Sequence, residues 1–523
     1  MLYEKNIFLK DYKKVDVRFG LCYPNVYRTA MSSLGYNILY NSINEREDTW
    51  CERIIYPNFK SIESDTSGKY FDILSFTLQF EEDYFNVLEM LKNTGIPLKR
   101  KNRSEDDPLI IAGGPCASAN PMPLSDYIDI FIIGEGENIL NEFIEIYKTS
   151  ENKNLEKFLG TDGIYIPEFD NETELVRIND MNETYHITQP VITKSDDEEF
   201  QSIFNNSIML NVSRGCTRGC RFCMSGYLYR PCRETDCETL IDIAVESRKN
   251  TGLNKITLIG AAVSDYSNLN QLIESLEKEG FQISTPSLRI ESITRETLTA
   301  LKKSGLKTIT LAPESIPRLR KVVNKDISDE KIFSVIQNAV ELDFNIKLYF
   351  LIGIPGESFE DIEKLCNYMK KIADMHNDLK KVKFSINPVI PKPHTPLQWE
   401  SYDFNDIKKK TRYIKKEMKK YNIKCESPKK GLIQYILSCG NSSVGELIEK
   451  SLSEKLTLKD WKEITPEYNI DDVLPWSKID TGINKRFLIK EHKNLKTLKQ
   501  TPWCENSGCY NCGVCKKLLL EKN

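Results

Sequence analysis

The chain has 523 residues, of which 72 are basic and 76 acidic, so its formal net charge is −4 at pH 7. A chain of this length is expected to form roughly three domains of ~150 residues each. The balanced charge lacks the global basic field of nucleic-acid-binding proteins. No stretch approaches the ~18–20 apolar residues of a membrane span. We therefore predict neither a membrane nor a nucleic acid as a partner.

The chain contains 15 cysteines and only four histidines. Residues 1–5 begin no apolar signal segment, so we expect a cytoplasmic protein. In a reducing compartment, clustered cysteines favour metal sites over disulfides. The scarcity of histidine excludes zinc sites of the HExxH type.

Residues 1–150 alternate short apolar runs with helical patterns. Strands are predicted at 15–21, 71–76, 109–112 and 128–133, and helices at 31–42 and 84–93. Such alternation predicts an α/β fold with a Rossmann-like, doubly wound parallel sheet. Ligands of these sheets lie outside the carboxyl ends of the strands.

Residues 151–205 are polar and acidic and are predicted to form a linker with a small hairpin, in which 163–167 is one strand. From 206 to 400 the strand–helix alternation resumes. Six strands are predicted at 208–212, 255–259, 282–290, 307–312, 347–352 and 381–386. They indicate a partial (β/α)6 TIM-type barrel with its chemistry at the carboxyl ends of the strands.

Residues 401–500 are predicted to form a helical C-terminal region, with helices at 404–420, 430–439 and 443–451 that cap the open side of the barrel or shape its mouth. A Cys-rich tail follows at 501–523. Within the extended loop at 391–399, His394 is a candidate acid–base residue, a substrate contact or a structural histidine.

Three cysteines, Cys216, Cys220 and Cys223, follow the first barrel strand in the spacing CxxxCxxC. A cubic iron–sulfur cluster usually takes four thiolates, so a loop with three leaves one iron open. Gly215 and Gly219 allow the loop to wrap tightly. Zinc takes four ligands, typically as two pairs, and fits this spacing poorly.

Positive charge is expected beside the anionic cluster, from Arg214, Arg218 and Arg221.

The CxxxCxxC loop resembles that of the radical S-adenosylmethionine (SAM) enzymes. The resemblance implies that Cys216, Cys220 and Cys223 are catalytic ligands of a [4Fe–4S] cluster whose open iron binds SAM. One electron from the cluster then cleaves SAM to a 5′-deoxyadenosyl radical. The resemblance also implies a low-potential electron donor such as ferredoxin or flavodoxin.

The same resemblance extends through the barrel and implies further SAM contacts at Phe222, Gly260, Ala261, Arg289, Glu314, Gly353 and Pro355. Gly260 and Ala261 stand where the family usually has Gly-Gly-Glu. Glu291 is a second candidate beside Arg289 for the ribose.

Residues 1–150 resemble the cobalamin-binding domain that precedes the barrel in one branch of this family. The resemblance is carried by two turns after neighbouring strands, 113–115 (Gly-Gly-Pro) and 134–137 (Gly-Glu-Gly-Glu). It implies cobalamin contacts at Tyr23, Asn25, Gly113, Gly114, Gly134, Glu135 and Gly136. The first 185 residues contain no histidine, so this domain offers no histidine to cobalt. In this branch the common reaction is methyl transfer to an unactivated carbon.

Two alternatives stay open. Cys22, Cys51 and Cys116 resemble the dispersed cysteines that hold a second cluster in radical SAM methylthiotransferases, which act on tRNA or protein. A non-catalytic iron–sulfur protein is the other alternative. The substrate is not identified by any residue, and a protein substrate is compatible with the sequence.

The tail carries a second metal signal, Cys504, Cys509, Cys512 and Cys515. The first three match the plant-ferredoxin spacing C-x4-C-x2-C, and four thiolates also suit structural zinc. The prediction is an auxiliary iron–sulfur or zinc centre.

Overall fold

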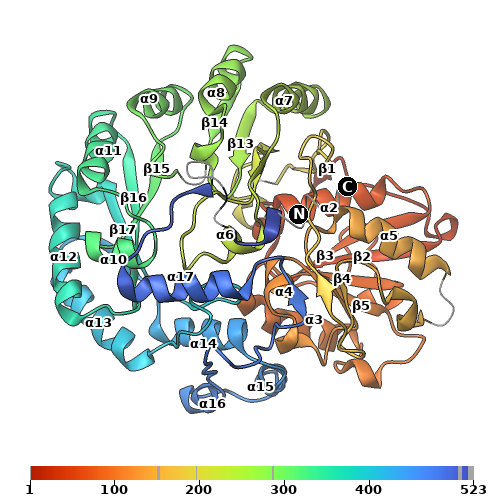
Figure 1. Ribbon diagram of the computed structural model, residues 1–523. Helices are drawn as coiled ribbons and strands as arrows, with labels where there is room; N and C mark the ends of the chain where they lie inside the picture. The colour runs from red at the N-terminus through yellow and green to blue at the C-terminus, as the bar shows by residue number, and fades with distance from the viewer. Residues whose placement is uncertain are drawn as a thin grey trace.

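A computed structural model describes residues 2–149, 153–195, 197–285, 288–504, 509 and 511–515. Figure 1 shows two α/β bodies side by side, a red-to-orange sheet and a green-to-cyan barrel, with helix α17 (Lys485–Thr497) lying across the front. The described part of the chain contains no helix with the length and apolarity that a bilayer span requires.

The N-terminal sheet has the strand order β3-β2-β4-β5-β6-β7, with β7 antiparallel and the others parallel. Its strands are β2 (Val17–Tyr23), β3 (Thr49–Ile55), β4 (Ile73–Thr77), β5 (Leu109–Gly113), β6 (Ile130–Ile132) and β7 (Ile164–Tyr165). One face is covered by α2 (Leu34–Asn44) and α5 (Gly136–Thr149), and the other by α3 (Tyr84–Thr94) and α4 (Pro115–Ala119). This confirms the predicted doubly wound sheet.

Strand β3 is absent from the sequence prediction because two charged residues interrupt its apolar pattern. Glu52 and Arg53 are both fully buried. Arg18 pairs with Glu52 at 2.6 Å, and Arg53 pairs with Glu4 at 2.7 Å and Glu63 at 2.6 Å. Buried charge is tolerated when it is paired in this way.

The strand expected at 163–167 forms as β7, but the small hairpin expected there is wrong. β7 pairs antiparallel with β6. The sheet therefore continues past residue 150 into the segment expected to be a linker.

The barrel has seven parallel strands in two hydrogen-bonded groups, β10-β13-β14 and β15-β16-β17-β18. They are β10 (Ile208–Asn211), β13 (Lys255–Ile259), β14 (Gln282–Ser284), β15 (Thr308–Glu314), β16 (Asn345–Ile352), β17 (Val382–Pro388) and β18 (Asn422–Cys425). The helices on the outside are α7 (Cys237–Thr251), α8 (Leu269–Lys278), α9 (Arg295–Lys303), α11 (Asp329–Glu341), α12 (Phe359–Ala373) and α13 (Phe404–Glu417). An open, partial barrel is confirmed.

Two details of the barrel differ from the sequence prediction. The third strand ends at Ser284 rather than at residue 290, so Arg289 lies in the loop beyond it. The edge strand β18 lies in the region expected to be wholly helical. The expected helices are present there as α13, α14 (Pro428–Cys439) and α15 (Ser443–Ser451), followed by α16 (Leu458–Glu463).

Short elements complete the chain. They are α1 (Tyr27–Ala30), α6 (Met224–Leu228), α10 (Pro317–Val322) and the two-residue strand pairs β1 (Glu4–Lys5) with β9 (Ile192–Thr193), β8 (Thr173–Glu174) with β19 (Ile479–Asp480), and β11 (Ser213–Arg214) with β12 (Arg233–Glu234).

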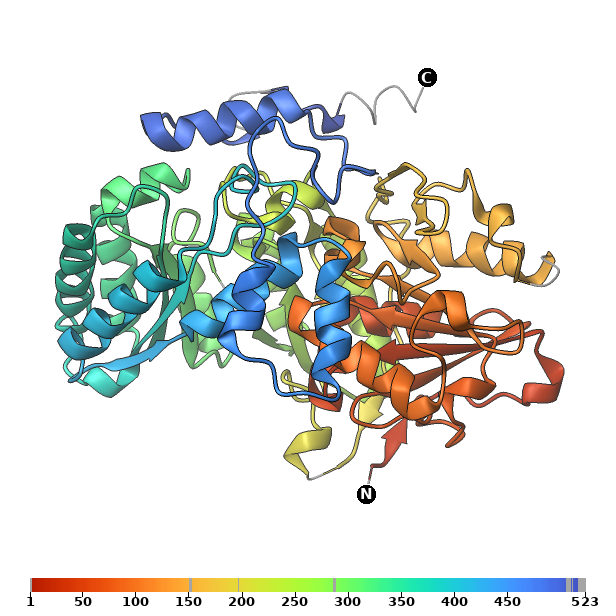
Figure 2. The same cartoon turned by 90° about the horizontal axis from the view of Figure 1, so that it is seen from below.

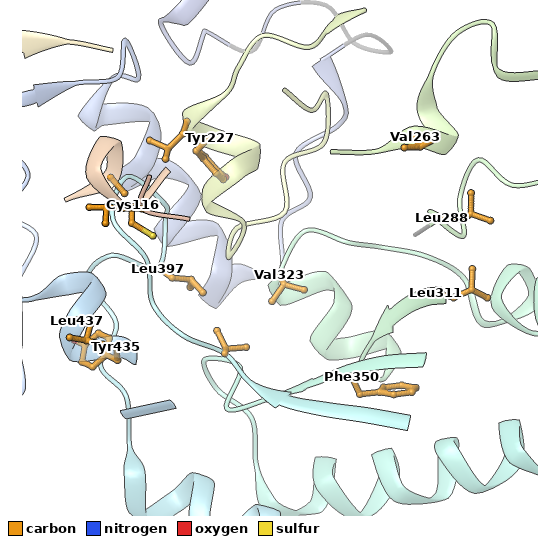
Figure 3. Close-up of a cluster of buried hydrophobic side chains, with 14 of the residues drawn as sticks. Cys116, Tyr227, Val263, Leu288, Leu311, Val323, Phe350, Leu397, Tyr435 and Leu437 are labelled. Carbon is orange, nitrogen blue, oxygen red and sulfur yellow. The ribbon is translucent and has the colours of Figure 1, made fainter. Parts of the chain in front are cut away.

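One of two hydrophobic clusters runs from the N-terminal sheet into the barrel, and the other lies beneath α2 and α5. Figure 3 shows Cys116 of α4 beside Tyr227 of α6, with Leu397 and Phe350 extending the same cluster through the barrel. The packing fixes the carboxyl ends of both sets of strands relative to one another.

Candidate functional site

A cavity of about 450 Å³ lies between the N-terminal sheet and the barrel. On the sheet side its lining comes from the ends of β4, β5 and β6 and from the first turns of α2 and α5. On the barrel side it comes from the ends of β10 and β13 and from the cluster loop. The lining includes Ser33, Leu34, Thr77, Gly113, Gly114, Gly134, Gly136, Asn211, Gly215, Ser225, Tyr229, Gly260 and Ala261. One cavity thus joins the two regions where ligands of parallel α/β folds bind.

The cluster loop runs from β11 to α6 and begins with a glycine that the fold requires. Gly215 has φ +82°, and a Cβ placed there would lie 2.2 Å from the carbonyl oxygen of Tyr229. Only glycine meets both conditions. The loop can therefore wrap against the chain that follows it.

The three loop thiols lie within electrostatic reach of one another. Cys216 and Cys220 are buried and Cys223 is half-buried. Burial, with the neighbouring thiolates of Cys220 and Cys216, raises the pKa of Cys223 to about 12. Within the described ranges no three cysteine, histidine or carboxylate side chains stand in a closed coordination arrangement. The role of these three thiols as cluster ligands, for which a metal would have to deprotonate them, therefore stays a prediction.

The three arginines expected to offset the charge of a cluster are instead paired with carboxylates. Arg214 pairs with Glu137 at 2.5 Å, Arg218 binds Asp265 through two contacts of 2.8 Å, and Arg221 pairs with Glu491 at 3.1 Å. These ion pairs hold the loop in place, and the positive charge expected beside a cluster stays a prediction. Asp265, on the turn after β13, was missed by the sequence analysis.

Arg289 is the cation that approaches a cluster ligand. Its Nη2 lies 3.9 Å from the Sγ of Cys220 and 2.8 Å from Oε1 of Glu291. Its Nε, which lies 3.7 Å from Oδ2 of Asp265, and Oε2 of Glu291 are buried without a hydrogen-bond partner among the described residues. Burial alone would raise the pKa of Glu291, but the charges of Arg289 and Lys325 outweigh it and lower that pKa. These two unsatisfied polar atoms fit a polar ligand beside the cluster, as a SAM molecule would be.

The other candidate SAM residues are spread around the barrel mouth. Gly260 and Ala261 line the cavity, whereas Phe222 packs against the core. Glu314 is the last residue of β15 and forms an ion pair with Lys325 at 2.8 Å. Its side chain is buried. Its role as a SAM contact stays a prediction.

Gly353 and Pro355 lie in the turn after β16, outside the lining of this cavity. Gly353 donates its N–H to Glu357 at 2.6 Å, and Glu357 pairs with Lys410 at 2.9 Å. The turn is thus fixed in shape, and its contact with adenine stays a prediction.

The two glycine turns of the sheet line the cavity as expected, but packing already explains two of their glycines. A Cβ on Gly114 would lie 2.8 Å from the oxygen of Leu78, and a Cβ on Gly134 would lie 2.2 Å from the oxygen of Val176. A Cβ on Gly136 would meet nothing nearer than 3.8 Å. Close packing therefore accounts for the glycines at 114 and 134. At 136 packing does not require glycine, and space for a ligand is a reason for it.

Glu135 also lines the cavity, and its carboxylate is already bound by other residues, so its contact with cobalamin stays a prediction. Its carboxylate accepts hydrogen bonds from Arg233 at 2.8 and 3.0 Å and from the N–H of Ile178 at 2.8 Å, and Arg214 lies 3.4 Å away. The turn is thereby joined to the strand that pairs with the start of the cluster loop.

Tyr23 and Asn25 are not among the residues that line the cavity. Tyr23 is buried against Tyr36, with ring centroids 5.0 Å apart, and Asn25 donates to Asp83 at 2.7 Å. The first turn of α2 lines the cavity in their place. No motif marks that segment beyond its small residues, Ser33 and Gly35.

Cys22, Cys51 and Cys116 cannot share a metal, because they lie on two faces of one sheet. Cys51 packs in the core beneath α2 and α5, whereas Cys22 and Cys116 pack in the core on the opposite face. Burial raises the pKa of all three thiols. The alternative that used them as cluster ligands is wrong.

His394 is a structural residue. It is buried, and its Nε2 lies 3.0 Å from the carbonyl oxygen of Ala119 at the end of α4. Burial lowers the pKa of His394 to about 4. The neutral ring ties the loop after β17 to the N-terminal sheet.

The Cys-rich tail lies on the cluster loop. The N–H of Cys504 donates to the carbonyl of Thr217 at 3.3 Å, and the carbonyl of Cys512 accepts from the N–H of Asn484 at 2.7 Å. The N–H of Asn511 donates to the Sγ of Cys509 at 3.3 Å.

Burial, with the thiolates of Cys512, Cys504 and Cys509, raises the pKa of Cys515. The four predicted ligands are therefore near one another. Residues 505–508 and 510 of the motif lie outside the described residues.

Comparison with known proteins agrees with this geometry. Residues 35–167 match the family described as "Radical SAM proteins, N-terminal", and residues 210–369 match the "Radical SAM superfamily". An uncharacterized protein of Methanocaldococcus jannaschii is 33% identical over 441 residues, which cover 83% of this chain and 90% of that protein.

Two solved structures share the fold. The radical SAM methyltransferase TsrM from Kitasatospora setae, solved with cobalamin and a [4Fe–4S] cluster bound, has a TM-score of 0.53 at 14% identity and covers 74% of this chain and 77% of its own. The cobalamin-dependent radical SAM enzyme OxsB, solved with aqua-cobalamin and SAM bound, has a TM-score of 0.50 at 13% identity and covers 97% of this chain and 80% of its own.

Proposed function

This chain belongs to the radical SAM superfamily, and we propose that it is a cobalamin-dependent methyltransferase acting on an unactivated carbon. One observation carries the proposal: a single cavity is lined by the glycine turns of the sheet and by the start of the loop that holds Cys216, Cys220 and Cys223. When bound, the cluster with SAM supplies a carbon-centred radical, and cobalamin supplies the methyl group. The protein positions and shields these groups.

Arg289 and Glu291 are the residues that would orient SAM. The Nε of Arg289 suits a carboxylate, and Oε2 of Glu291 suits a hydroxyl or ammonium donor. Because both side chains are held by their mutual 2.8 Å contact, they are in place before a ligand arrives. Preorganisation of this kind lowers the entropic cost of binding.

The fit to cobalamin rests on position and on the lining of the cavity. Phe76, Ile132, Leu140 and Ile259 make much of the lining apolar, which excludes water from a reactive centre. The lining contains no histidine or cysteine, so cobalt would receive no imidazole or thiolate ligand from it. Cobalamin exceeds the 450 Å³ of the cavity, so only part of the cofactor could lie inside.

The catalytic half of the proposal is tested on anaerobically reconstituted full-length protein with SAM and dithionite. We expect 5′-deoxyadenosine and S-adenosylhomocysteine, measured by liquid chromatography–mass spectrometry. The triple variant C216A/C220A/C223A should form no 5′-deoxyadenosine, whereas C425A, a half-buried cysteine on β18, should behave as wild type. Equal product from the triple variant would refute the assignment of the cluster.

The cobalamin half has a matched pair of variants at Gly136. Alanine fits there without contact, because a Cβ would meet nothing nearer than 3.8 Å. Leucine would extend into the cavity. We expect G136A to retain the corrin absorbance of the purified protein and G136L to lose it. If both variants retain the corrin absorbance, or if the wild type shows none, cobalamin binding at this site is refuted.

A methylthiotransferase is the weaker candidate, since the three cysteines it would use for a second cluster lie on two faces of the sheet. We further propose that Cys504, Cys509, Cys512 and Cys515 hold a second metal centre, iron–sulfur or zinc. Elemental analysis of C216A/C220A/C223A tests it, because any remaining stoichiometric iron or zinc must lie elsewhere in the chain.

A further inference from the structure

The outer face of α17 carries a strip of exposed positive charge on a chain whose net charge is −4. From 485 to 496 every exposed residue of this helix is basic. With one residue beyond the helix, the strip consists of Lys485, Arg486, Lys490, Lys493, Lys496 and Lys499. We call these six residues the α17 basic face.

No carboxylate in the described ranges forms an ion pair with the α17 basic face, whereas the acidic residue of this helix points inward. Glu491 is 1% exposed and pairs with Arg221. Phe487, Leu488 and Leu495 bury the remaining side of the helix. Six like charges are costly to keep together, so their segregation on one face suggests a use outside the fold.

The α17 basic face lies directly over the cluster loop. Arg221, between two of the cluster cysteines, donates to Glu491 at 3.1 Å and to the carbonyl of Lys499 at 2.5 Å. Figure 2 shows α17 as the outermost layer on this side of the molecule. An α-helix with its side chains is about 10–12 Å across, so one helix thickness separates the basic face from the loop.

The Cys-rich tail joins the same two places. Cys504 is hydrogen-bonded to the cluster loop at Thr217, and Cys512 to Asn484 at the start of α17. Asn511 of the tail shares a surface depression with Lys485, Arg486 and Lys490. The Cys-rich tail thus contacts both the cluster loop and the start of α17.

We propose that the α17 basic face is the docking site of a small acidic one-electron carrier, an iron–sulfur or flavin protein. The inference rests on the proposed radical SAM function, which consumes one low-potential electron per SAM cleaved. In the step, the carrier is oxidised by one electron and the cluster is reduced by one, and no bond forms or breaks. Complementary charge steers such encounters and fixes their orientation.

The test measures binding first, so that it does not depend on the activity of the loaded enzyme. The probe is an acidic plant-type [2Fe–2S] ferredoxin titrated against full-length protein at low salt. We expect R486E/K490E to weaken binding by about tenfold or more. The control K101E/K278E reverses two exposed lysines far from α17 and should stay within about twofold of wild type.

The salt dependence of binding and the affinity for two other kinds of partner test the proposal further. The difference between wild type and R486E/K490E should vanish at 1 M salt, where the Debye length falls to about 3 Å. Equal binding by both proteins at low salt would overturn the proposal. So would tighter binding of a single-stranded RNA oligonucleotide, or of a basic carrier such as a cytochrome, than of the ferredoxin.

A second readout separates this proposal from the proposed function. With dithionite, R486E/K490E should form 5′-deoxyadenosine at the wild-type rate, whereas with reduced ferredoxin it should form the product more slowly. Loss of product with both reductants, in R486E/K490E and in a second variant K493E/K496E, would count against docking as the cause. Absence of product in wild type would refute the enzyme function while leaving the binding result intact.

Discussion

The substitution E135Q tests whether the glycine turn at 134–137 is held by a buried charge network or offers its carboxylate to a cofactor. Glu135 is bound by two contacts from Arg233, by the N–H of Ile178 and by Arg214 at 3.4 Å. Glutamine keeps the shape of the side chain but leaves the buried guanidinium of Arg233 without its negative partner, whereas Arg214 keeps Glu137.

The expected cost of E135Q follows from the burial of the pair. The side chains of Arg233 and Glu135 are 7% and 4% exposed, and removal of one partner of a buried ion pair costs about 3–5 kcal/mol. Burial alone would raise the pKa of Glu135, but Arg233 and Arg214 lower it. The stabilisation is therefore present at neutral pH and is lost as the pH falls through the carboxylate range, and E135Q should remove that pH dependence.

The assay is urea denaturation at pH 7, followed by tryptophan fluorescence and circular dichroism. E142Q, an exposed glutamate on α5, is the matched control and should stay within about 0.5 kcal/mol of wild type. The double variant E135Q/R233M, which removes both charges, should recover much of the loss. A loss below about 1 kcal/mol for E135Q, combined with weaker cobalamin binding, would refute the reasoning and make Glu135 a ligand contact.

Three further outcomes are expected. G215A should lower the iron bound per chain several-fold, because its Cβ would lie 2.2 Å from the oxygen of Tyr229. The control G252A is also at positive φ but has open space around it, and it should bind iron as wild type does. Equal iron content in the two variants would contradict this. His394, whose pKa is about 4 rather than 6.5, should cost the folded state about 3 kcal/mol as the pH falls from about 6.5 to 4; urea midpoints should show that H394Q removes this dependence. R289Q should weaken SAM binding by at least about tenfold in equilibrium dialysis, and an unchanged affinity would exclude Arg289 from the SAM site.

The parallel sheet and the cluster loop could be predicted from the sequence because they depend on local pattern. Alternating apolar runs specify a parallel sheet, and three cysteines in eight residues specify a metal loop. Strand β3 could not be predicted, because Glu52 and Arg53 are paired with charged residues from other parts of the chain.

The errors at the candidate site share the same physical origin. Sequence places Arg218 and Arg221 beside the cluster, but it does not show that Asp265 and Glu491 meet them. The sequence likewise does not show that Cys51 and Cys22 lie on opposite faces of the sheet. Cys51 lies on β3, the strand that was not predicted. Long-range pairs decide which charges are free, and only the folded chain reveals them.

The contact between Arg221 and Glu491 joins residues 270 positions apart. A ribosome that adds about 5–20 residues per second takes on the order of 10–60 s to extend the chain from one to the other. During synthesis the three cysteines therefore emerge long before the helix that anchors their loop. The contact that anchors this loop can therefore form only after the chain has been synthesised as far as Glu491.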